Sequence, residues 1–170
     1  MLTEKMQAAL NDQLREELYS AYLYLSMSAY CETRSLPGFA SWMRIQYEEE
    51  MIHAFKFYDF IHDRNGRVLL QALGEPPAEF ESPLSVFEQT LAHEQHITGR
   101  INELYALAGQ ERDYASQTFL HWFVTEQVEE EKTATDIIET LRIIGDDGHA
   151  LLMVDRELGA RVLVPPPAAA

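Results

Sequence analysis

Apolar residues recur at intervals of three and four along four long stretches of this chain, approximately residues 4–33, 38–65, 84–109 and 113–144. This spacing is the period of amphipathic α-helices. A fifth, shorter helix is predicted from about Gly148 to Ala160. The 170 residues suffice for one domain with a sizeable core and are too few for two of ordinary size. We therefore predict an all-α domain over residues 1–164, followed by a loose tail, PPPAAA, at 165–170.

The breaks between the long helices predict their topology. Residues 35–38 (SLPG) separate the first two helices, Ser82 can cap the third, and Asp113 can cap the fourth. Such short connections make each pair of neighbouring helices an antiparallel hairpin. About 17 residues separate the two hairpins. They can span about 55 Å, more than the roughly 40 Å of a long helix. The sequence thus predicts a four-helix bundle with one long crossover loop and a short fifth C-terminal helix.

Each long helix carries a glutamate near the middle of the row of side chains that faces the bundle interior. The four are Glu17, Glu50, Glu94 and Glu130. His53 follows Glu50 by one helical turn and shares its face. Because both hairpins are short, Glu17 lies level with Glu50, and Glu94 lies level with Glu130. The pattern predicts four carboxylates and one imidazole at one level of the bundle.

The two hairpins repeat this pattern. The offset that maps Glu17 onto Glu94 also maps Glu50 onto Gln127 and His53 onto Glu130. The same offset maps Glu49 onto Glu126. The chain therefore reads as two duplicated halves with a pseudo-twofold site between them. The halves differ, because the first offers a glutamate and a histidine where the second offers a glutamine and a glutamate.

Four carboxylates in an apolar interior repel one another, and burying them without counter-charges is costly. Two divalent cations would balance the four negative charges, and hard carboxylates with one imidazole suit iron or manganese. We predict one metal at Glu17, Glu50 and His53. The second is predicted at Glu94 and Glu130 with weaker binding, with Gln127 nearby and Glu50 able to bridge. A lone Glu-x-x-His pair would be weak support, but four level carboxylates and the repeat strengthen it.

Composition excludes several other classes of protein. The formal net charge of −15 argues against binding to nucleic acid or to an anionic membrane surface, and favours cations as partners. The single cysteine, Cys31, cannot form an intrachain disulfide. The first residues lack the apolar core of a signal peptide, and no run is long and apolar enough to span a bilayer. We expect a cytoplasmic protein without a membrane segment.

Four motifs carry a resemblance to a known family. They are ELYSAYLYLSMSAY from Glu17, EEEMIHA around Glu50 and His53, HEQH around Glu94, and WFVTEQVEEEK from Trp122. On these motifs the chain resembles the ferritins, in particular the prokaryotic non-haem ferritins, from Met1 to about Arg161. The resemblance implies a ferritin-like bundle whose function is iron storage and detoxification.

The resemblance also implies roles for particular residues. Two Fe(II) ions would be oxidised by O2 or peroxide at a ferroxidase centre formed by Glu17, Glu50, His53, Glu94, Gln127 and Glu130. Tyr24 resembles the tyrosine that assists electron transfer there. A third iron site would comprise Glu49, Glu126 and Glu129, together with Glu130. The family assembles as a hollow homo-oligomeric shell of 24 subunits, on whose acidic inner wall ferric mineral grows. An apolar stripe at Tyr22, Leu25 and Ala29 is consistent with subunit packing.

Alternative functions stay open. A di-iron oxidase or peroxidase of the rubrerythrin kind would not store mineral, but the chain lacks the Cys-x-x-Cys pairs of a rubredoxin-like domain. Bacterioferritins bind haem through a methionine at the place of Met51. They would have Glu at position 127 and His at position 130, where this chain has Gln127 and Glu130, so we do not expect haem. A metal-free scaffold would leave the four interior carboxylates exposed.

Plainer interpretations compete for single residues. The run of glutamates at 129–131 is typical of a solvated charged face, and we prefer that interpretation for Glu131. Tyr24 and Trp122 are compatible with ordinary core packing. Glu49 and Glu126 lie about 100° from the interior rows and are compatible with the surface. His93 and His96 flank Glu94 at the wrong angles to share its face, so both are expected at the surface.

Overall fold

The computed structural model describes residues 2–164, which form five α-helices and no strand. They are α1 (Glu4–Thr33), α2 (Pro37–Asp63), α3 (Pro83–Gln110), α4 (Tyr114–Ile144) and α5 (Gly148–Leu158). The predicted loose tail at 165–170 lies outside the described residues. None of the helices within residues 2–164 has an apolar stretch of the length needed to cross a membrane.

Local sequence explains where the helices begin and end. Ser82 and Ser85 form a reciprocal capping box at the start of α3. Asp113 accepts a hydrogen bond from the backbone N–H of Ser116 at the start of α4. Gly145, with a φ of 54°, ends α4 as predicted. The second helix ends at Asp63 and not at 65, because Asn65 has left-handed backbone geometry, with a φ of 55°.

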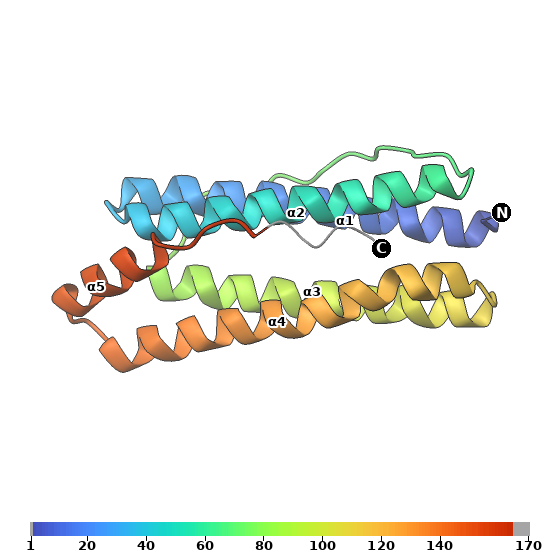
Figure 1. Ribbon diagram of the computed structural model, residues 1–170. Helices are drawn as coiled ribbons and strands as arrows, with labels where there is room; N and C mark the ends of the chain where they lie inside the picture. Colours follow the sequence, from blue (N-terminus) through green and yellow to red (C-terminus); the bar gives the residue numbers. More distant parts are fainter. Residues whose placement is uncertain (1, 165–170) are drawn as a thin grey trace.

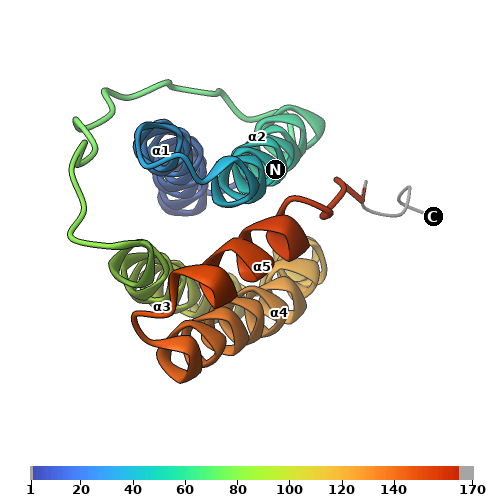
Figure 2. The same ribbon diagram turned by 90° about the vertical axis from the view of Figure 1, so that its left-hand side faces the viewer.

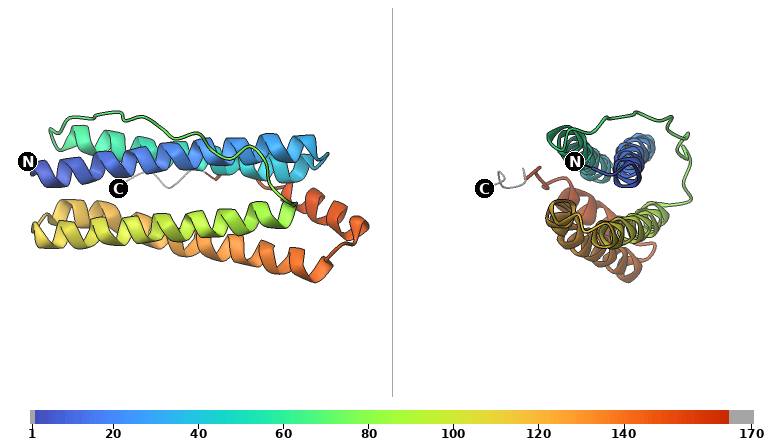
Figure 3. Two further views of the ribbon diagram at one scale, coloured as in Figure 1. Left: turned by 180° about the vertical axis from the view of Figure 1, so that it is seen from behind. Right: turned by 90° about the vertical axis from the view of Figure 1, so that its right-hand side faces the viewer.

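The helices pack as two antiparallel hairpins laid against each other. Figures 1 and 2 show α1 beside α2 in one layer and α3 beside α4 in the other. The chain between α2 and α3 crosses the length of the bundle on the α1 side (Figure 3). Asn11 on α1 holds this linker, because its side chain donates to the carbonyl of Arg67 and accepts from the N–H of Leu69. These bonds replace the backbone partners that a linker without secondary structure lacks.

The core has two apolar clusters. The first includes Tyr24, Met27, Phe39, Trp42 and Phe87. The second includes Leu10, Phe57, Ile101, Leu120 and Phe123. Along each of the four long helices, the buried glutamate falls between residues of one cluster and residues of the other. The carboxylates therefore occupy a polar layer that apolar packing encloses at both ends.

Helix α5 is fixed to the start of α2 by one buried carboxylate. Asp155 Oδ1 accepts hydrogen bonds from the backbone N–H groups of Gly38, at 2.8 Å, and Phe39, at 3.0 Å. The N-cap residue of α2, Leu36, makes no side-chain cap, so Asp155 supplies it from α5. A β-carbon at Gly38 would lie 1.6 Å from the carbonyl oxygen of Asp155, so only glycine permits this approach. The cap orients α5 and the chain that follows it.

Substitution Asp155→Ala should lower the stability of the subunit, because two N–H groups at the start of α2 lose their acceptor. Loss of such a cap costs about 1–2 kcal/mol, equivalent to a fall of roughly 2–8 °C in the unfolding midpoint. Thermal denaturation followed by circular dichroism measures this fall. Glu157→Ala is the matched control, because Glu157 is exposed on the same helix. Equal midpoints for the two variants would contradict the capping role of Asp155.

Candidate metal centre

The first hairpin brings together a histidine and two glutamates at the centre of the bundle. Glu17 from α1 and Glu50 and His53 from α2 each offer a ligand atom, and these atoms lie within 4.8 Å of one another. The Nδ1 atom of His53 lies 3.3 Å from Glu50 Oε2 and 3.9 Å from Glu17 Oε2. All three side chains are buried. This geometry matches the first metal position that the sequence predicts.

A second group shares the same histidine. Ligand atoms of His53, Glu126 and Glu130 also lie within 4.8 Å of one another. Glu126 precedes Glu130 by four residues, so the two lie on neighbouring turns of one face of α4. The third site predicted from the resemblance pairs Glu126 with Glu130, and here the two carboxylates also lie near His53. The two groups are candidate sets of metal ligands that share His53.

Three of the four interior glutamates accept a hydrogen bond from a neutral amide. The Nε2 atom of Gln13 donates to Glu17 at 2.9 Å, that of Gln46 donates to Glu130 at 2.9 Å, and that of Gln127 donates to Glu94 at 3.0 Å. An amide donor orients a carboxylate without adding charge. Each bond fixes one oxygen of its glutamate and leaves the site as negative as before.

Glu50 is the exception among the four interior glutamates. Its Oε2 atom is buried and accepts no hydrogen bond from the described residues 2–164. The residue as a whole is only 2% exposed, so water cannot replace the missing donor readily. An unsatisfied buried acceptor costs about 1–3 kcal/mol, and more when it is charged. The residues present therefore fit a cation between the hairpins, which would satisfy this oxygen.

Burial raises the pKa of all four interior carboxyl groups. The pKa values of Glu17 and Glu50 lie well above the usual range, first because of desolvation and then because of neighbouring glutamates. Desolvation also raises the pKa of Glu94, and it raises that of Glu130 to about 8, with a contribution from the charge of Glu94. Without a cation, burial therefore favours the protonated form of these groups. A metal ion that binds here must displace the protons.

Tyr24 lies directly on the centre. Its hydroxyl donates a hydrogen bond to Glu94 Oε1. Burial, followed by the charge of Glu94, raises the pKa of Tyr24 well above its usual value, so the hydroxyl keeps its proton and stays a donor. The side chain is fully buried at the edge of the apolar cluster on that side. Its predicted part in electron transfer stays a prediction.

Trp122 packs against the shared histidine. Its ring meets that of His53 edge to face, with 5.2 Å between centroids. The ammonium nitrogen of Lys56 lies 4.2 Å from the centroid of the Trp122 ring, at the distance of a cation–π contact. The indole thus packs against His53 and restricts its orientation, although Trp122 itself belongs to neither ligand group.

Two residues predicted for the third site, Glu49 and Glu129, belong to neither ligand group among the described residues. Glu49 is half-buried, and its Oε2 atom accepts a hydrogen bond from Nη2 of Arg161 at 2.6 Å. Glu129 is exposed on α4. Glu126 and Glu130 are the members of that site whose ligand atoms lie in a group with His53 among the described residues. The third site therefore stays a prediction.

Helix α1 covers His93 more than the sequence suggested. The residue was expected at the surface, but its Nε2 atom lies 2.7 Å from Ser20 Oγ, and its ring packs near those of Tyr19 and Tyr24. Burial, together with the nearby His96, lowers the pKa of His93 to about 4. His93 is therefore neutral near pH 7, while His96 is exposed as expected.

Sequence reasoning missed three residues that support the centre. Gln13 lies one turn before Glu17 on α1, so its spacing of four residues could have revealed it. Gln46 donates to Glu130 on the other hairpin, and this orientation depends on how the two hairpins pack. Arg161 follows α5, and its Nη1 atom donates to Gln46 Oε1 at 2.5 Å. No local pattern marks that arginine.

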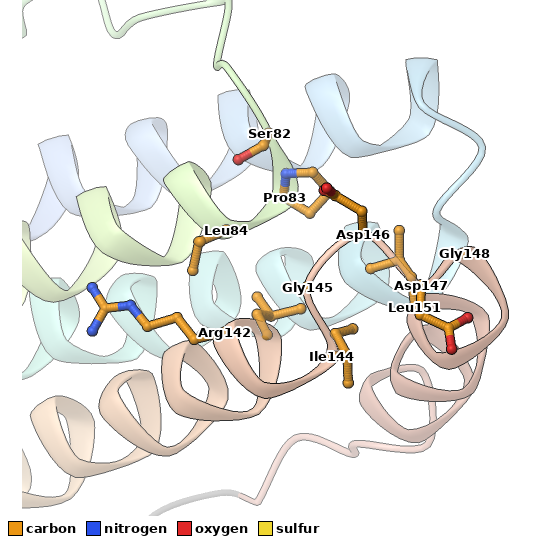
Figure 4. A pocket seen from close by; sticks show the side chains of 11 residues that line it. Ser82, Pro83, Leu84, Arg142, Ile144, Gly145, Asp146, Asp147, Gly148 and Leu151 are labelled. Carbon is orange, nitrogen blue, oxygen red and sulfur yellow. The ribbon is translucent and has the colours of Figure 1, made fainter.

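The bundle also has a pocket away from the carboxylates. It lies between the start of α3, the end of α4 and the start of α5, where Leu84, Arg142, Asp146 and Leu151 are among its lining residues (Figure 4). Neither group of metal-binding side chains lies there. The candidate metal ligands therefore lie in the polar layer and not in this pocket.

Comparison with known proteins agrees with this geometry. Residues 7–144 match the family model described as the ferritin-like domain. The bacterial non-heme ferritins of Staphylococcus epidermidis and Staphylococcus saprophyticus are 42% and 43% identical to this chain over 161 residues. The alignments cover 95% of this chain, and 97% and 96% of the two relatives. The resemblance found in the sequence motifs is confirmed.

Solved structures give the same result for the fold. An open pore ferritin from the hyperthermophilic archaeon Archaeoglobus fulgidus superposes with a TM-score of 0.94 at 52% identity, covering 95% of this chain and 99% of that one. An engineered closed form of the Archaeoglobus fulgidus ferritin superposes with a TM-score of 0.95 at 52% identity, covering 96% and 100%. The predicted ferritin-like bundle with one crossover is confirmed.

The raised pKa values predict how the stability of the metal-free protein depends on pH. The folded state binds more protons than the unfolded state above the usual carboxyl pKa, so stability falls as pH rises through about 8, the pKa of Glu130. The unfolding midpoint should fall by at least about 4 °C between about pH 6 and about pH 8.5. Thermal denaturation of chelator-treated protein measures it.

Two controls bear on that prediction. Glu130→Gln removes one titrating group from the centre and should flatten the profile, and a saturating divalent cation should flatten it further. A midpoint that rises with pH over this window in the metal-free protein would contradict the direction of the shifts.

Proposed function

This chain belongs to the ferritin family, and we propose that it stores iron by oxidising Fe(II) within each subunit and holding the ferric product as mineral in a hollow shell. The relatives named bacterial non-heme ferritins support storage as the function. Oxidation belongs to storage because Fe(III) hydrolyses to an insoluble oxyhydroxide, whereas Fe(II) stays in solution. The iron is both the substrate and the cargo.

The observation that carries the proposal is the unsatisfied oxygen of Glu50. Glu50 Oε2 is buried, has no hydrogen-bond donor among residues 2–164, and faces the Nδ1 atom of His53 at 3.3 Å. In a purely structural bundle, an amide or a basic side chain would satisfy that oxygen, as amides do for the other three glutamates. A ferrous ion at this position fits a group of hard oxygen ligands with one imidazole.

We assign the first ferrous ion to Glu17, Glu50 and His53. The second is assigned to Glu130 and Glu94, with Glu126 within reach of the same histidine. Glu50 would bridge the two ions, since its Oε2 atom is free of hydrogen bonds within residues 2–164. Gln127 acts at this centre by donating to Glu94, and it remains a predicted ligand of the second ion. The second position has no histidine of its own, which supports unequal affinities.

The proposed reaction is ferroxidation. Each Fe(II) gives one electron, so two adjacent ions supply the pair of electrons that reduces O2 to hydrogen peroxide, or hydrogen peroxide to water. The carboxyl groups release their protons as the ions bind, because metal ligation requires the deprotonated form. Tyr24, held as a donor on Glu94, is proposed to assist electron transfer.

Glu49, Glu126 and Glu129 are proposed to form the third iron site, which receives or passes iron beside the pair. The half-buried and exposed positions of these residues support a transfer role, since iron leaving a buried centre needs carboxylates on the way out. Glu130 joins the two sites, because it belongs to the paired centre and lies on the same helix as two of these residues. Haem is not part of this proposal.

The proposed assembly is a homo-oligomeric shell, of 24 subunits by family resemblance. Exposed apolar side chains on α1, α2 and the crossover support it, because they are more than an isolated bundle needs. They are Tyr22, Leu25, Phe55, Tyr58 and Leu70. The net charge of −15 supports an acidic inner surface that attracts cations and nucleates mineral.

Glu50→Ala should abolish fast Fe(II) oxidation, because it removes the bridging ligand of both proposed ions. The initial rate should fall by at least about 100-fold, while folding is unchanged or slightly improved because a buried anion is deleted. Stopped-flow absorbance after aerobic mixing with Fe(II) measures the rate. Glu48→Ala is the control, because Glu48 is an exposed glutamate two positions away. Unchanged kinetics in the Glu50 variant would refute the bridging role.

Aerobic loading of metal-free protein with excess Fe(II), followed by size separation and counting of iron per chain, separates storage from its alternatives. Hundreds of iron atoms travelling with a large particle are expected. About two or three per chain would leave a di-iron oxidase or peroxidase of the rubrerythrin kind. Absence of bound iron would show that the interior glutamates do not bind iron and that the proposed function is wrong.

A further inference from the structure

The chain after α5 turns back along α2, as Figure 1 shows. This return path follows from the Asp155 cap, which fixes the end of α5 against the start of α2. It places Arg161 beside three side chains on α2, namely Trp42, Gln46 and Glu49. Those positions lie on successive turns of one helix face. One arginine therefore spans the surface between the apolar cluster and the edge of the metal centre.

Arg161 makes a specific contact with each of the three. Its Nη2 atom donates to Glu49 Oε2 at 2.6 Å, and its Nη1 atom donates to Gln46 Oε1 at 2.5 Å. The guanidinium carbon lies 4.5 Å from the centroid of the Trp42 ring. The Arg161 side chain is 25% exposed, and that of Glu49 is 18% exposed. Partial burial and the planar guanidinium make this pair stronger than a typical surface ion pair.

The arginine also sets the orientation of Gln46. A guanidinium donates hydrogen bonds and cannot accept them, so the amide oxygen of Gln46 must face Arg161. Its amide nitrogen must then face the opposite way, where it donates to Glu130 Oε2 at 2.9 Å. A continuous chain of hydrogen bonds thus joins Arg161, through Gln46, to a carboxylate of the paired centre.

We infer that Arg161 is a built-in counter-cation for Glu49, which a divalent cation must displace before it binds to that carboxylate. The assignment of Glu49 to iron rests on the proposed function, whereas the contacts of Arg161 do not. The arginine neutralises the one carboxylate of the predicted third site that lies on α2. The paired centre therefore fills first, and Glu49 becomes available only when the segment after α5 moves Arg161 away.

The inference accounts for two observations together. Glu126 already lies with the paired centre, whereas Glu49 is turned toward Arg161 and takes part in neither ligand group. Arg161 is a positioning residue, since it touches neither ligand group directly. Its reach to Glu49 depends on where α5 ends, so the third site and the C-terminal segment are coupled.

The test is anaerobic calorimetric titration of the assembled, metal-free protein with Mn(II), which is not oxidised under these conditions. In Arg161→Ala, the affinity for a third ion per subunit should rise by about tenfold, the effect expected for loss of one competing charge. The affinities of the first two ions should change less than that of the third, because Arg161 reaches the paired centre only through Gln46. Arg161→Gln is the second variant, because it keeps a side chain over Trp42 and protects folding.

Two controls separate competition from a merely structural effect. Arg156→Ala removes an exposed arginine from α5 that makes no side-chain hydrogen bond or ion pair within residues 2–164, and it should change no affinity. Adding Arg161→Ala to Glu49→Gln should have no further effect on the third ion, because the contested carboxylate is gone. A gain that persists in the Glu49→Gln background would overturn the inference.

The remaining outcomes distinguish failure of the counter-cation role from failure of the paired metal centre. If the original protein binds two ions and Arg161→Ala leaves the third unchanged or weaker, the inference fails and the paired centre stands. If neither protein binds Mn(II), both fail. If the original protein binds no Mn(II) and the arginine variants bind one ion, the counter-cation role stands and the paired centre is wrong.

Discussion

Mutual repulsion among four buried carboxylates is the constraint on which this structure depends. Each long helix places a glutamate in the interior at the same level, where desolvation and neighbouring charges raise the carboxyl pKa values. The two apolar clusters above and below must supply the stability that this layer lacks. Their large aromatic side chains serve that purpose. A cation bound in this layer would convert the least stable part of the bundle into one of its strongest connections.

The sequence was sufficient for the fold and for the common level of the four interior glutamates because both depend on short-range rules. Helical periodicity assigned the faces of Glu17, Glu50, Glu94 and Glu130, and short hairpins assigned their level. Helix caps at Ser82 and Asp113 were equally local. The predicted bounds differ from the observed ones by two residues or fewer, and the largest difference for a long helix arises at Asn65, whose left-handed geometry ends α2 early.

Apart from the local contact between Gln13 and Glu17, the contacts that escaped prediction join segments distant in the sequence. Asp155 caps α2 across 117 positions, and Arg161 reaches Gln46 across 115. The grouping of Glu126 with His53 depends on how far α4 is rotated against α2, and a periodic pattern gives that angle only coarsely. His93 was misplaced for the same reason, because the neighbouring helix and not its own face decides its burial. Packing geometry, and not residue type, separates what was predictable from what was not.

The three amide donors set the chemical character of the polar layer. Glutamines at positions 13, 46 and 127 orient carboxylates without neutralising them. A lysine or arginine at any of these positions would turn the same carboxylate into half of a permanent salt bridge. The layer would then be stable without metal and would have little affinity for it. The boundary between a metal-binding bundle and an inert one is therefore narrow here, and a change of a single neutral side chain to a basic one could cross it.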